Sequence, residues 1–287
     1  MATTTTTTID DMLPTIVAES EFTVRAQSIF YFGGPGRPWI DVRDLVGQAG
    51  NAIGFPIRSQ FTAYDVTEGV DHALSQAMST SKPTVTATEI VAITTIEDLA
   101  QVSSKEDEAS KAAIELGAAI AAKYDSKVFA LNNGLDVECG TTTANLTGAM
   151  ITTALETLAT AKAPPPYLGL LHTHQWGDLV TESSGLLKPA AGSAWDTENL
   201  VRDMYILAEF MGVKLIISPL IPLANADADR SGAIISNRAY GLLDKWPLRI
   251  EKERDASRRA TELVATLCFG VGEKDGTMGV ALESGYA

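Results

Sequence analysis

Hydrophobic and polar positions favour strands in two well-separated parts of the chain. The segment Thr84–Ile96 is dense in Thr, Val and Ile, which suit a pleated, half-buried surface. Near the end, Glu253–Glu273 and Gly279–Glu283 are typical of a strand, a charged turn and further strand. A tail of this kind completes a sheet, and it contains no nucleophile, metal box or phosphate loop. We therefore expect these segments to be structural.

The N-terminal part is predicted to be a helix. Its pattern starts at Asp10 or Asp11, either of which can be the N-cap, and the turn-rich segment Phe30–Pro38 breaks the chain after it. The apolar positions of the helix are Leu13, Ile16, Val17 and Val24.

Residues Trp39–Tyr64 predict a hairpin that projects from the body. Apolar and polar residues alternate around Ile40 and again around Phe55, as they do in two strands. Between these strands, Gly47–Ala52 is expected to be a flexible tip. Pro56 has no N–H to donate, so the second strand is expected at an edge.

A longer helix is expected from Lys105 to Leu131. Ser103 and Glu106 have the spacing of a capping box, and Asn132–Gly134 ends the helix. At about 1.5 Å per residue this helix spans roughly 40 Å. Its apolar face is formed by Ala109, Ala113, Leu116, Ile120, Tyr124, Val128 and Leu131.

Residues 135–230 change to short alternating elements, typical of a compact insert. The predicted elements are a helix over Leu146–Lys162, a strand over Tyr167–His172, a helical stretch around Glu198–Met211 and a buried strand over Val213–Ser218.

Composition narrows the classes of function. The 287 residues suffice for one large domain or two smaller ones, and 45% hydrophobic with 20% charged residues argues against wholesale disorder. A net charge of −14 argues against a protein that grips nucleic acid over its whole surface, because such binding needs clustered Lys and Arg. No apolar run approaches the roughly 18 residues of a transmembrane helix, and the threonine-rich start at Thr3–Thr8 does not resemble a signal peptide.

The pair His172 and His174 is the main candidate for chemistry. His-x-His at a strand end can supply two zinc ligands, with a third from His72 or a carboxylate. A strand that enters a helix at Gln175–Asp178 explains the pair as well. We predict no catalytic, cofactor-binding or metal-binding residues in this chain.

Other candidate motifs fail on residue type. Asn225–Asp229 has the alternating carboxylates of a calcium loop, but Arg230 and Ser236 replace the required Gly and Glu. The clusters Gly33–Gly36 and Gly270–Gly272 lack the Walker lysine and are predicted to be turns or bulges.

Two further features have structural explanations. Cys139 and Cys268 lie far apart in sequence and are expected to be buried, reduced thiols. The mixed charges of Lys245–Arg259 are typical of a solvated face with salt bridges. A subunit contact is the alternative, in which opposite charges select register and orientation.

Several segments together resemble the major capsid proteins of tailed bacteriophages, which have the Hong Kong 97-like capsid fold. These segments are Ile9–Glu19, Lys82–Leu99, Leu171–Leu179, Ile235–Gly241 and Glu253–Gly272. They follow the family's order over nearly the whole chain, although none is a catalytic signature. The resemblance implies an α+β fold with an N-terminal arm, an extended β-hairpin loop, a peripheral domain with a long spine helix, and an axial α/β domain.

The resemblance also implies boundaries for these parts. The arm comprises residues 1–35, the extended loop 36–70, the peripheral domain 71–134 and 231–287, and the axial domain 135–230. The tail returns to the peripheral domain. His172 and His174 fall where the family commonly has a Leu-His-Pro turn, which favours a structural role; Thr173 replaces the proline.

Two departures from the family limit what the resemblance implies. Some members join neighbours by an isopeptide bond from a lysine of the extended loop, but the first lysine here is Lys82, so this bond is excluded. Others begin with a long scaffolding segment, for which this chain has no room. A separate scaffolding protein, or none, is implied.

The function implied is that of a major capsid protein and not of an enzyme. Hexamers and pentamers of the chain would close into an icosahedral phage head around double-stranded DNA. The implied partners are other copies, a portal, scaffolding or decoration proteins, and DNA held without sequence-specific contacts; no cofactor or membrane is involved. The chain would be made in the host cytoplasm and end in the virion. Two alternatives are an encapsulin-type nanocompartment shell with protein cargo, and a metal-dependent hydrolase using His172 and His174.

Overall fold

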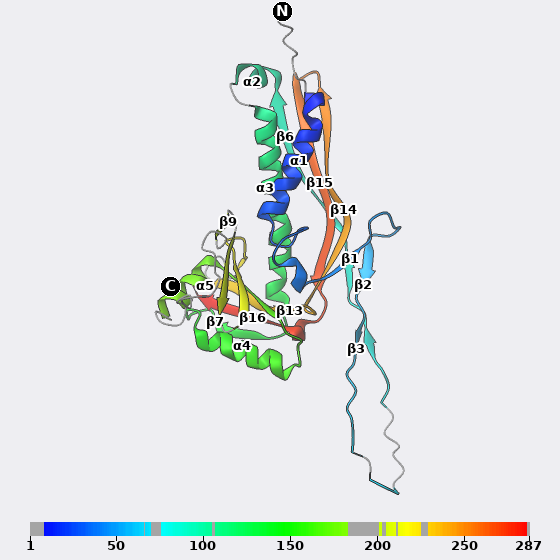
Figure 1. The fold of residues 1–287 in the computed structure, drawn as a ribbon, viewed down its shortest axis with the longest axis vertical. Coiled ribbons are helices and arrows are strands. Elements are labelled where there is room, and N and C mark those ends of the chain that lie inside the picture. Colours follow the sequence, from blue (N-terminus) through cyan, green and yellow to red (C-terminus); the bar gives the residue numbers. More distant parts are fainter. Residues whose placement is uncertain are drawn as a thin grey trace, which may run out of the picture.

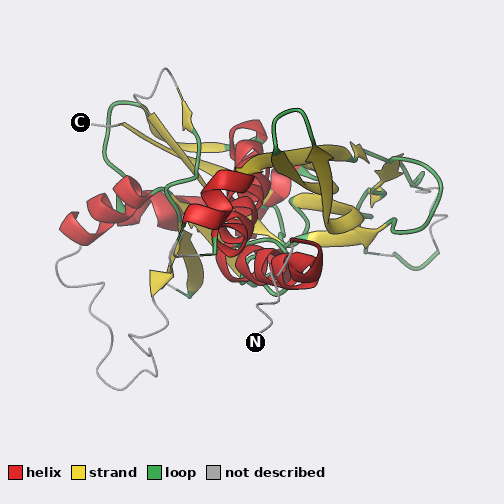
Figure 2. Cartoon of the chain, turned by 90° about the horizontal axis from the view of Figure 1, so that it is seen from above, coloured by secondary structure: helices red, strands yellow, loops and turns green. Residues whose placement is uncertain are grey.

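Two sheets, joined at the end of a long helix, form the body, and a thin arm projects from it (Figure 1). The computed structural model describes residues 9–65, 67–69, 76–104, 107–182, 201–202, 205–210, 212–224 and 229–285. Thr3–Thr8, His72, Glu106 and most of the predicted calcium loop (225–228) lie outside the described residues. Viewed from above, helices lie at the centre of the molecule with strands on both sides (Figure 2).

The first sheet has four strands in the order β1-β14-β15-β6. Their bounds are β1 Asp41–Asp44, β14 Tyr240–Asp255, β15 Ala260–Glu273 and β6 Thr88–Glu97. β1 runs parallel to β14, and the other pairs are antiparallel. The predicted C-terminal strand pair is confirmed. The predicted strand near residue 90 is also confirmed, although Ala87 divides it into β5 (Thr84–Thr86) and β6.

Two helices cover one face of this sheet. α3 (Glu108–Phe129) packs on β6 and β15, and α1 (Ile9–Gln27) packs on α3. The ring of Tyr124 stacks on that of Phe269, with centroids 4.1 Å apart. α1 approaches α3 closely at Gly117, where a Cβ would lie 2.7 Å from the carbonyl oxygen of Ser20.

The predicted start of the long helix was wrong. The short helix α2 (Asp98–Ser103) occupies that stretch, and the Ser103 hydroxyl donates back to the carbonyl of Leu99 at 2.6 Å. Asp107 is the actual N-cap and accepts from the N–H of Ala109 at 3.1 Å. α3 therefore has 22 residues and spans about 33 Å, and the 3-10 turn η2 (Ala130–Gly134) ends it as expected.

A buried carboxylate fixes the turn that follows α1. Asp125 of α3 accepts hydrogen bonds from the Ser28 hydroxyl (2.7 Å) and from the backbone N–H groups of Ile29 (2.7 Å) and Phe30 (3.2 Å). Burial raises the pKa of Asp125 to about 7, although the three donors act in the opposite direction. The turn-rich break after α1 is thus confirmed.

The second sheet has eight strands among the described residues, in the order β7-β16-β13-β8-β11-β10-β9, with β12 beside β13. Their bounds are β7 Glu138–Thr141, β16 Gly279–Gly285, β13 Asp229–Ser236, β8 Tyr167–Leu171, β11 Val213–Ile217, β10 Tyr205–Phe210, β9 Val201–Arg202 and β12 Leu223–Ala224. Two helices, α4 (Gly148–Thr160) and α5 (Thr173–Glu182), accompany it. The predicted helix over Leu146–Lys162 and the strands over Tyr167–His172 and Val213–Ser218 are confirmed.

The helix predicted around Glu198–Met211 was wrong. Its described part is strands β9 and β10, and β10 pairs antiparallel with β11. Gly212 adopts a left-handed φ of +78°, which lets the chain reverse so that Phe210 pairs with Val213. The ladder with a buried neighbour outweighs local helix propensity here.

The two sheets meet at the end of α3. The amide of Asn132 donates to the carbonyl of Ser231 in β13 (3.1 Å), and its oxygen accepts from the Tyr240 hydroxyl at the start of β14 (3.0 Å). β16, which was expected with the peripheral domain, instead pairs with β13 and β7 in the second sheet. The proposed domain boundaries themselves stay a prediction.

Asp125 makes the stability of the protein depend on pH. The pKa of Asp125 is raised in the folded state. Between about pH 4 and 7, the folded chain therefore keeps a proton on Asp125 that the unfolded chain has already released. The stability that this group contributes is present at low pH and is lost as pH rises through 7. We expect the unfolding free energy of the native chain to fall over this range relative to an Asp125→Asn variant, as measured by denaturant titration. Equal slopes for the native chain and Asp125→Asn would contradict the prediction.

Candidate functional site: the projecting arm and its base

The projecting arm, which corresponds to the predicted extended loop and not to the N-terminal arm, is built from strands that the sequence pattern did not pair. β2 (Ala52–Gly54) pairs with β5, and β3 (Ile57–Arg58) pairs with β4 (Thr80–Ser81). The predicted pairing of the strands around Ile40 and Phe55 was therefore wrong. β1 uses its hydrogen bonds on β14 instead, so the strands that return along the arm come later in the sequence.

The far part of the arm lies beyond β3 and β4 (Figure 1). The side chain of Gln76 donates to the carbonyl of Thr62 (2.6 Å) and accepts from its N–H (2.9 Å). Gly47–Ala52 is not the tip, because Lys245 of β14 donates to the carbonyl of Gln48 at 2.5 Å and holds this segment beside the sheet.

A small apolar cluster anchors the base of the arm. Phe55 is fully buried among Leu45, Val85 and Leu243. Arg43 of β1 lies over the Phe55 ring, with its guanidinium carbon 4.7 Å from the ring centroid. The base is thus packed as a core, although only short strands connect it to the rest of the arm.

Glycines in the sheet make room for this base. A Cβ at Gly241 would lie 2.9 Å from the Phe55 ring, and one at Gly270 would lie 2.6 Å from the carbonyl oxygen of Thr86. Gly270–Gly272 was predicted to be a turn or bulge and instead lies in the regular ladder of β15. Gly33–Gly36 does form turns, with Gly33 at a φ of +88°.

Buried and half-buried ion pairs hold the chain that leads into the arm. Arg37 pairs with Asp244 of β14, and Lys274 pairs with Asp41 of β1 at 2.6 Å. Burial raises the pKa of Asp244, while the hydrogen bond from Arg37 acts against this shift. β1 is therefore held both by its hydrogen bonds to β14 and by the ion pair of its residue Asp41.

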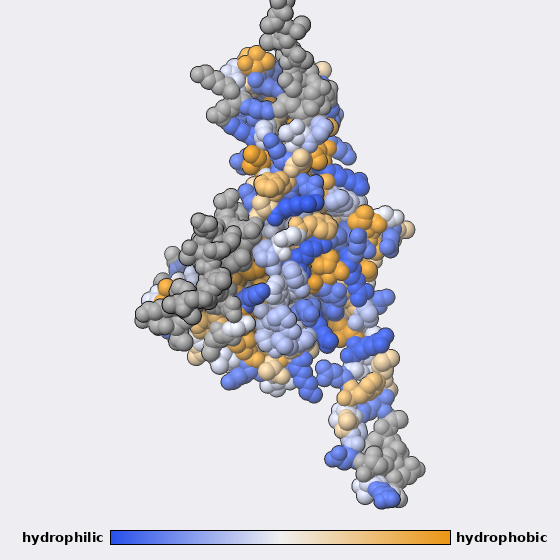
Figure 3. Space-filling view, in the orientation of Figure 1, coloured by the Kyte–Doolittle hydropathy of each residue, from blue (hydrophilic) through white to orange (hydrophobic). Residues whose placement is uncertain are grey.

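The outer arm exposes apolar side chains without basic ones. Phe61, Tyr64 and Met78 are 59%, 54% and 55% exposed, and residues 59–81 contain acidic residues but no Lys or Arg. Figure 3 shows apolar side chains in several separate patches over the body and along the arm. The rest of the subunit thus leaves these three side chains more than half exposed.

The histidine pair has a structural task at the start of α5. The ring Nδ1 of His172 accepts from the N–H of His174 at 3.1 Å, as an N-cap does, and the N–H of His172 donates to Gln175 at 3.1 Å. Burial, then the charges of Arg230 and His174, lower the pKa of His172 to about 4. The imidazole therefore stays neutral and keeps the lone pair that capping requires.

The other residues considered for metal binding or redox chemistry lie in strands of the two sheets. Asp229, the described end of the predicted calcium loop, is buried in β13. No group of three or more His, Cys, Asp or Glu side chains in the described ranges is arranged to hold a metal ion. Cys139 and Cys268 are free thiols as predicted, with Cys268 buried and Cys139 half-buried. Among the residues that the structure describes, no helix is long and apolar enough to cross a membrane.

The mixed charges of Lys245–Arg259 lie along β14 and the turn after it. Arg254 binds Asp98 through two hydrogen bonds of 2.5 and 2.6 Å, and both side chains are well exposed. Asp255 accepts from the backbone of Ser257 and so shapes the turn. The solvated face with salt bridges is confirmed; a subunit contact there stays a prediction.

Comparisons with solved structures relate this arrangement to known proteins. No protein-family model matches the sequence, and no curated protein is significantly similar to it. The capsid of Ralstonia phage GP4 superposes with a TM-score of 0.70 at 11% identity, covering 92% of both chains. The capsid of cyanophage P-SCSP1u gives 0.64 at 17% identity, covering 87% of both. The chain has the fold of tailed-phage capsid proteins.

The same capsid fold also occurs in another particle. A virus-like particle from Pyrococcus furiosus superposes with a TM-score of 0.63 at 11% identity, covering 94% of this chain and 98% of that one. The predicted Hong Kong 97-like fold, with its long helix and extended arm, is confirmed. Because the phage capsids and this particle superpose about equally well, the fold alone does not separate the two kinds of shell.

Removal of the Phe55 ring should release the base of the arm. Truncation of a fully buried Phe costs about 3 kcal/mol, so Phe55→Ala should increase amide exchange of residues 52–58 and 84–86 about a hundredfold. Phe61→Ala, at an exposed position of the same arm, is the matched control and should leave exchange unchanged. Unchanged protection in Phe55→Ala would show that the cluster does not anchor the arm.

The capping task of His172 predicts a specific pattern of substitutions. His172→Ala should lower the unfolding free energy by about 1 kcal/mol, whereas His172→Asn should retain most of it, because Asn is a favoured N-cap. Thermal or denaturant unfolding measures both. If the two variants lose the same stability, the ring nitrogen does not act as the cap.

Proposed function

We propose that this chain is the major capsid protein of a tailed phage. The observation that carries the proposal is the arm: it projects from a body with the capsid fold and exposes Phe61, Tyr64 and Met78 where its own subunit does not cover them. These side chains are explained if a neighbouring subunit covers them. The N-terminal arm and the peripheral and axial domains then take the positions implied by the sequence resemblance.

The mechanism is repeated, modest contact between identical subunits. The arm of each subunit contacts a neighbour in a hexamer or pentamer. Many such weak contacts act together because the shell holds the subunits in place. The base of the arm is a packed core, so the arm keeps its direction while its outer part fits the neighbour. Closure of these capsomers gives an icosahedral head.

The negative charge of the chain bears on what the proposed shell contains. A formal charge of −14 suits a wall that encloses double-stranded DNA without adhering to it, since tight binding needs clustered cations. A portal, a scaffolding protein and decoration proteins are the further partners of such a head. The chain would be made in the host cytoplasm and would act in the virion as a structural protein, without catalysis or cofactor.

An encapsulin-type nanocompartment is the second candidate. It is favoured by the superposition on the virus-like particle from Pyrococcus furiosus over almost the full length of both chains. Purified particles discriminate the two, because a phage head packages DNA and a nanocompartment holds protein cargo. A metal-dependent hydrolase using His172 and His174 is disfavoured, because the His172 ring nitrogen is already the cap of α5.

Shortening of the arm should separate folding from assembly. The N–H of Ser59 donates to the carbonyl of Ser79 at 3.0 Å, so replacing residues 60–78 with Asn-Gly closes the arm by a tight turn. We expect a folded subunit that forms no closed shells, as observed by electron microscopy and sedimentation. The triple variant Phe61→Ser, Tyr64→Ser, Met78→Ser keeps the length and should reduce assembly in the same direction. Normal particles from the shortened chain would contradict the role of the arm.

A further inference from the structure

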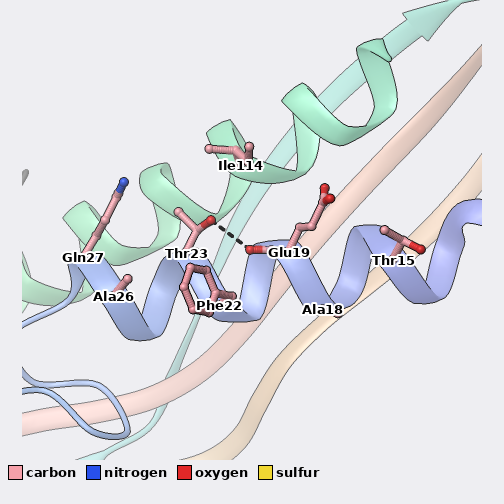
Figure 4. A pocket seen from close by; sticks show the side chains of 8 residues that line it. All are labelled: Thr15, Ala18, Glu19, Phe22, Thr23, Ala26, Gln27 and Ile114. Carbon is pink, nitrogen blue, oxygen red and sulfur yellow. Dashed lines mark hydrogen bonds between the residues drawn. The ribbon is translucent and has the colours of Figure 1, made fainter. Parts of the chain in front are cut away.

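A groove of about 800 Å³ lies along α1, with Ile114 of α3 at its side (Figure 4). Its lining includes Ala18, Phe22 and Ala26 of α1 and Ile114 of α3. Phe22 is 74% exposed and Ile114 is 46% exposed. A large aromatic side chain next to two small residues gives this surface both a protrusion and a recess.

Two charged residues of α1 lie at equal spacings before and after Phe22. Glu19 precedes Phe22 by three residues and Arg25 follows it by three, while Ala18 and Ala26 lie four residues before and after it. Residues at these spacings lie on one face of a helix. A second α1, antiparallel and related by a two-fold axis at Phe22, would therefore place its Arg25 at the level of Glu19, within reach of the long side chains, and its Ala26 at the level of Ala18.

We propose that α1 of a second copy of this chain packs antiparallel in this groove, with the two Phe22 rings at the two-fold axis. The small Ala18 and Ala26 side chains leave room for the two rings at the axis, where each Phe22 covers apolar surface of the other copy. Such a contact is isologous: each copy presents the same patch. It rests on the proposed function, because it would be one of the contacts that join subunits of a shell.

The charged partners are available for this exchange. Arg25 binds Glu21 on its own helix at 2.5 Å with 56% of its side chain exposed, and exposed pairs of this kind contribute little to folding. Glu19 accepts from the Ser110 hydroxyl through one carboxylate oxygen, Oε2. Arg25 can therefore move to the Glu19 carboxylate of a second copy without loss of a buried interaction.

The outer arm of a neighbour is a poorer occupant of this groove. Residues 59–81 have acidic side chains and no Lys or Arg, so the arm would place negative charge beside Glu19. A second α1 instead brings Arg25 to Glu19 on both sides of the axis. Charge complementarity thus selects α1 over the arm.

Charge exchange between two variants tests the contact. Glu19→Arg alone gives two Arg–Arg pairs across the axis, and Arg25→Glu alone gives two Glu–Glu pairs, so each should weaken the association at least tenfold. An equimolar mixture of the two variants restores both opposite-charge pairs in mixed dimers. We expect the mixture, and the double variant Glu19→Arg/Arg25→Glu, to recover association in sedimentation velocity. Rescue by mixing cannot come from repair of a folding defect, so it would assign the loss to the charges. Folded single variants that are not rescued by mixing would overturn the proposal.

Cross-linking places the symmetry axis. Phe22→Cys puts two thiols at the axis, where mild oxidation should give a covalent dimer. Thr15→Cys lies seven residues away, about 10 Å from the axis on each copy, and should not cross-link; both variants retain the native Cys139 and Cys268. Equal yields from the two variants, or none from Phe22→Cys, would overturn the proposal.

The outcome is separable from that of the proposed function. Closed particles that lack the Phe22→Cys cross-link would leave the capsid role intact and reject this contact. A cross-linked dimer with charge rescue, from a chain that never forms shells, would support the contact and reject the capsid role. Loss of association in Phe22→Ala without rescue in the charge mixture would assign the groove to another occupant.

Discussion

The buried carboxylate of Asp125, which joins the turn after α1 to α3, is the constraint on which the other parts depend. Asp125 receives three hydrogen bonds from the turn after α1, next to the stacked rings of Tyr124 and Phe269. The turn directs the chain to Arg37, whose pairing with Asp244 brings β1 onto β14. The position of the arm is thus set by a polar interaction inside the apolar core.

Rigidity and exposure are divided along the arm. Its base is a small apolar core, in which the Phe55 ring packs over Gly241 and the carbonyl oxygen of Thr86 in β5 lies close to Gly270. Beyond that base, apolar side chains such as Phe61 remain uncovered. A subunit with a stiffly anchored, incompletely buried projection is suited to contacts with other copies. α1 presents a second uncovered surface, and its different charge pattern suits a different neighbour.

Much of the fold could be predicted from local pattern. The helix spacing around Ile16 and Ile120, and the Thr, Val and Ile density before Ile96, predicted elements that the structure contains. The failures share one cause, which is competition from another hydrogen-bond partner that the apolar pattern does not reveal. Ser103 bonds within α2 and leaves the cap to Asp107, and Tyr205–Phe210 joins a ladder with β11 instead of coiling.

The sequence by itself determined most of the element types, the absence of basic residues in the outer arm and the Glu19, Phe22 and Arg25 spacing on α1, because these depend on local residue order. Only the tertiary structure decided which strands pair along the arm and where the tail ends. Strand pairing joins residues far apart in the chain, and its register follows from side chains such as Phe55 finding space over a glycine. That space exists only after β14 and β15 have paired in the first sheet.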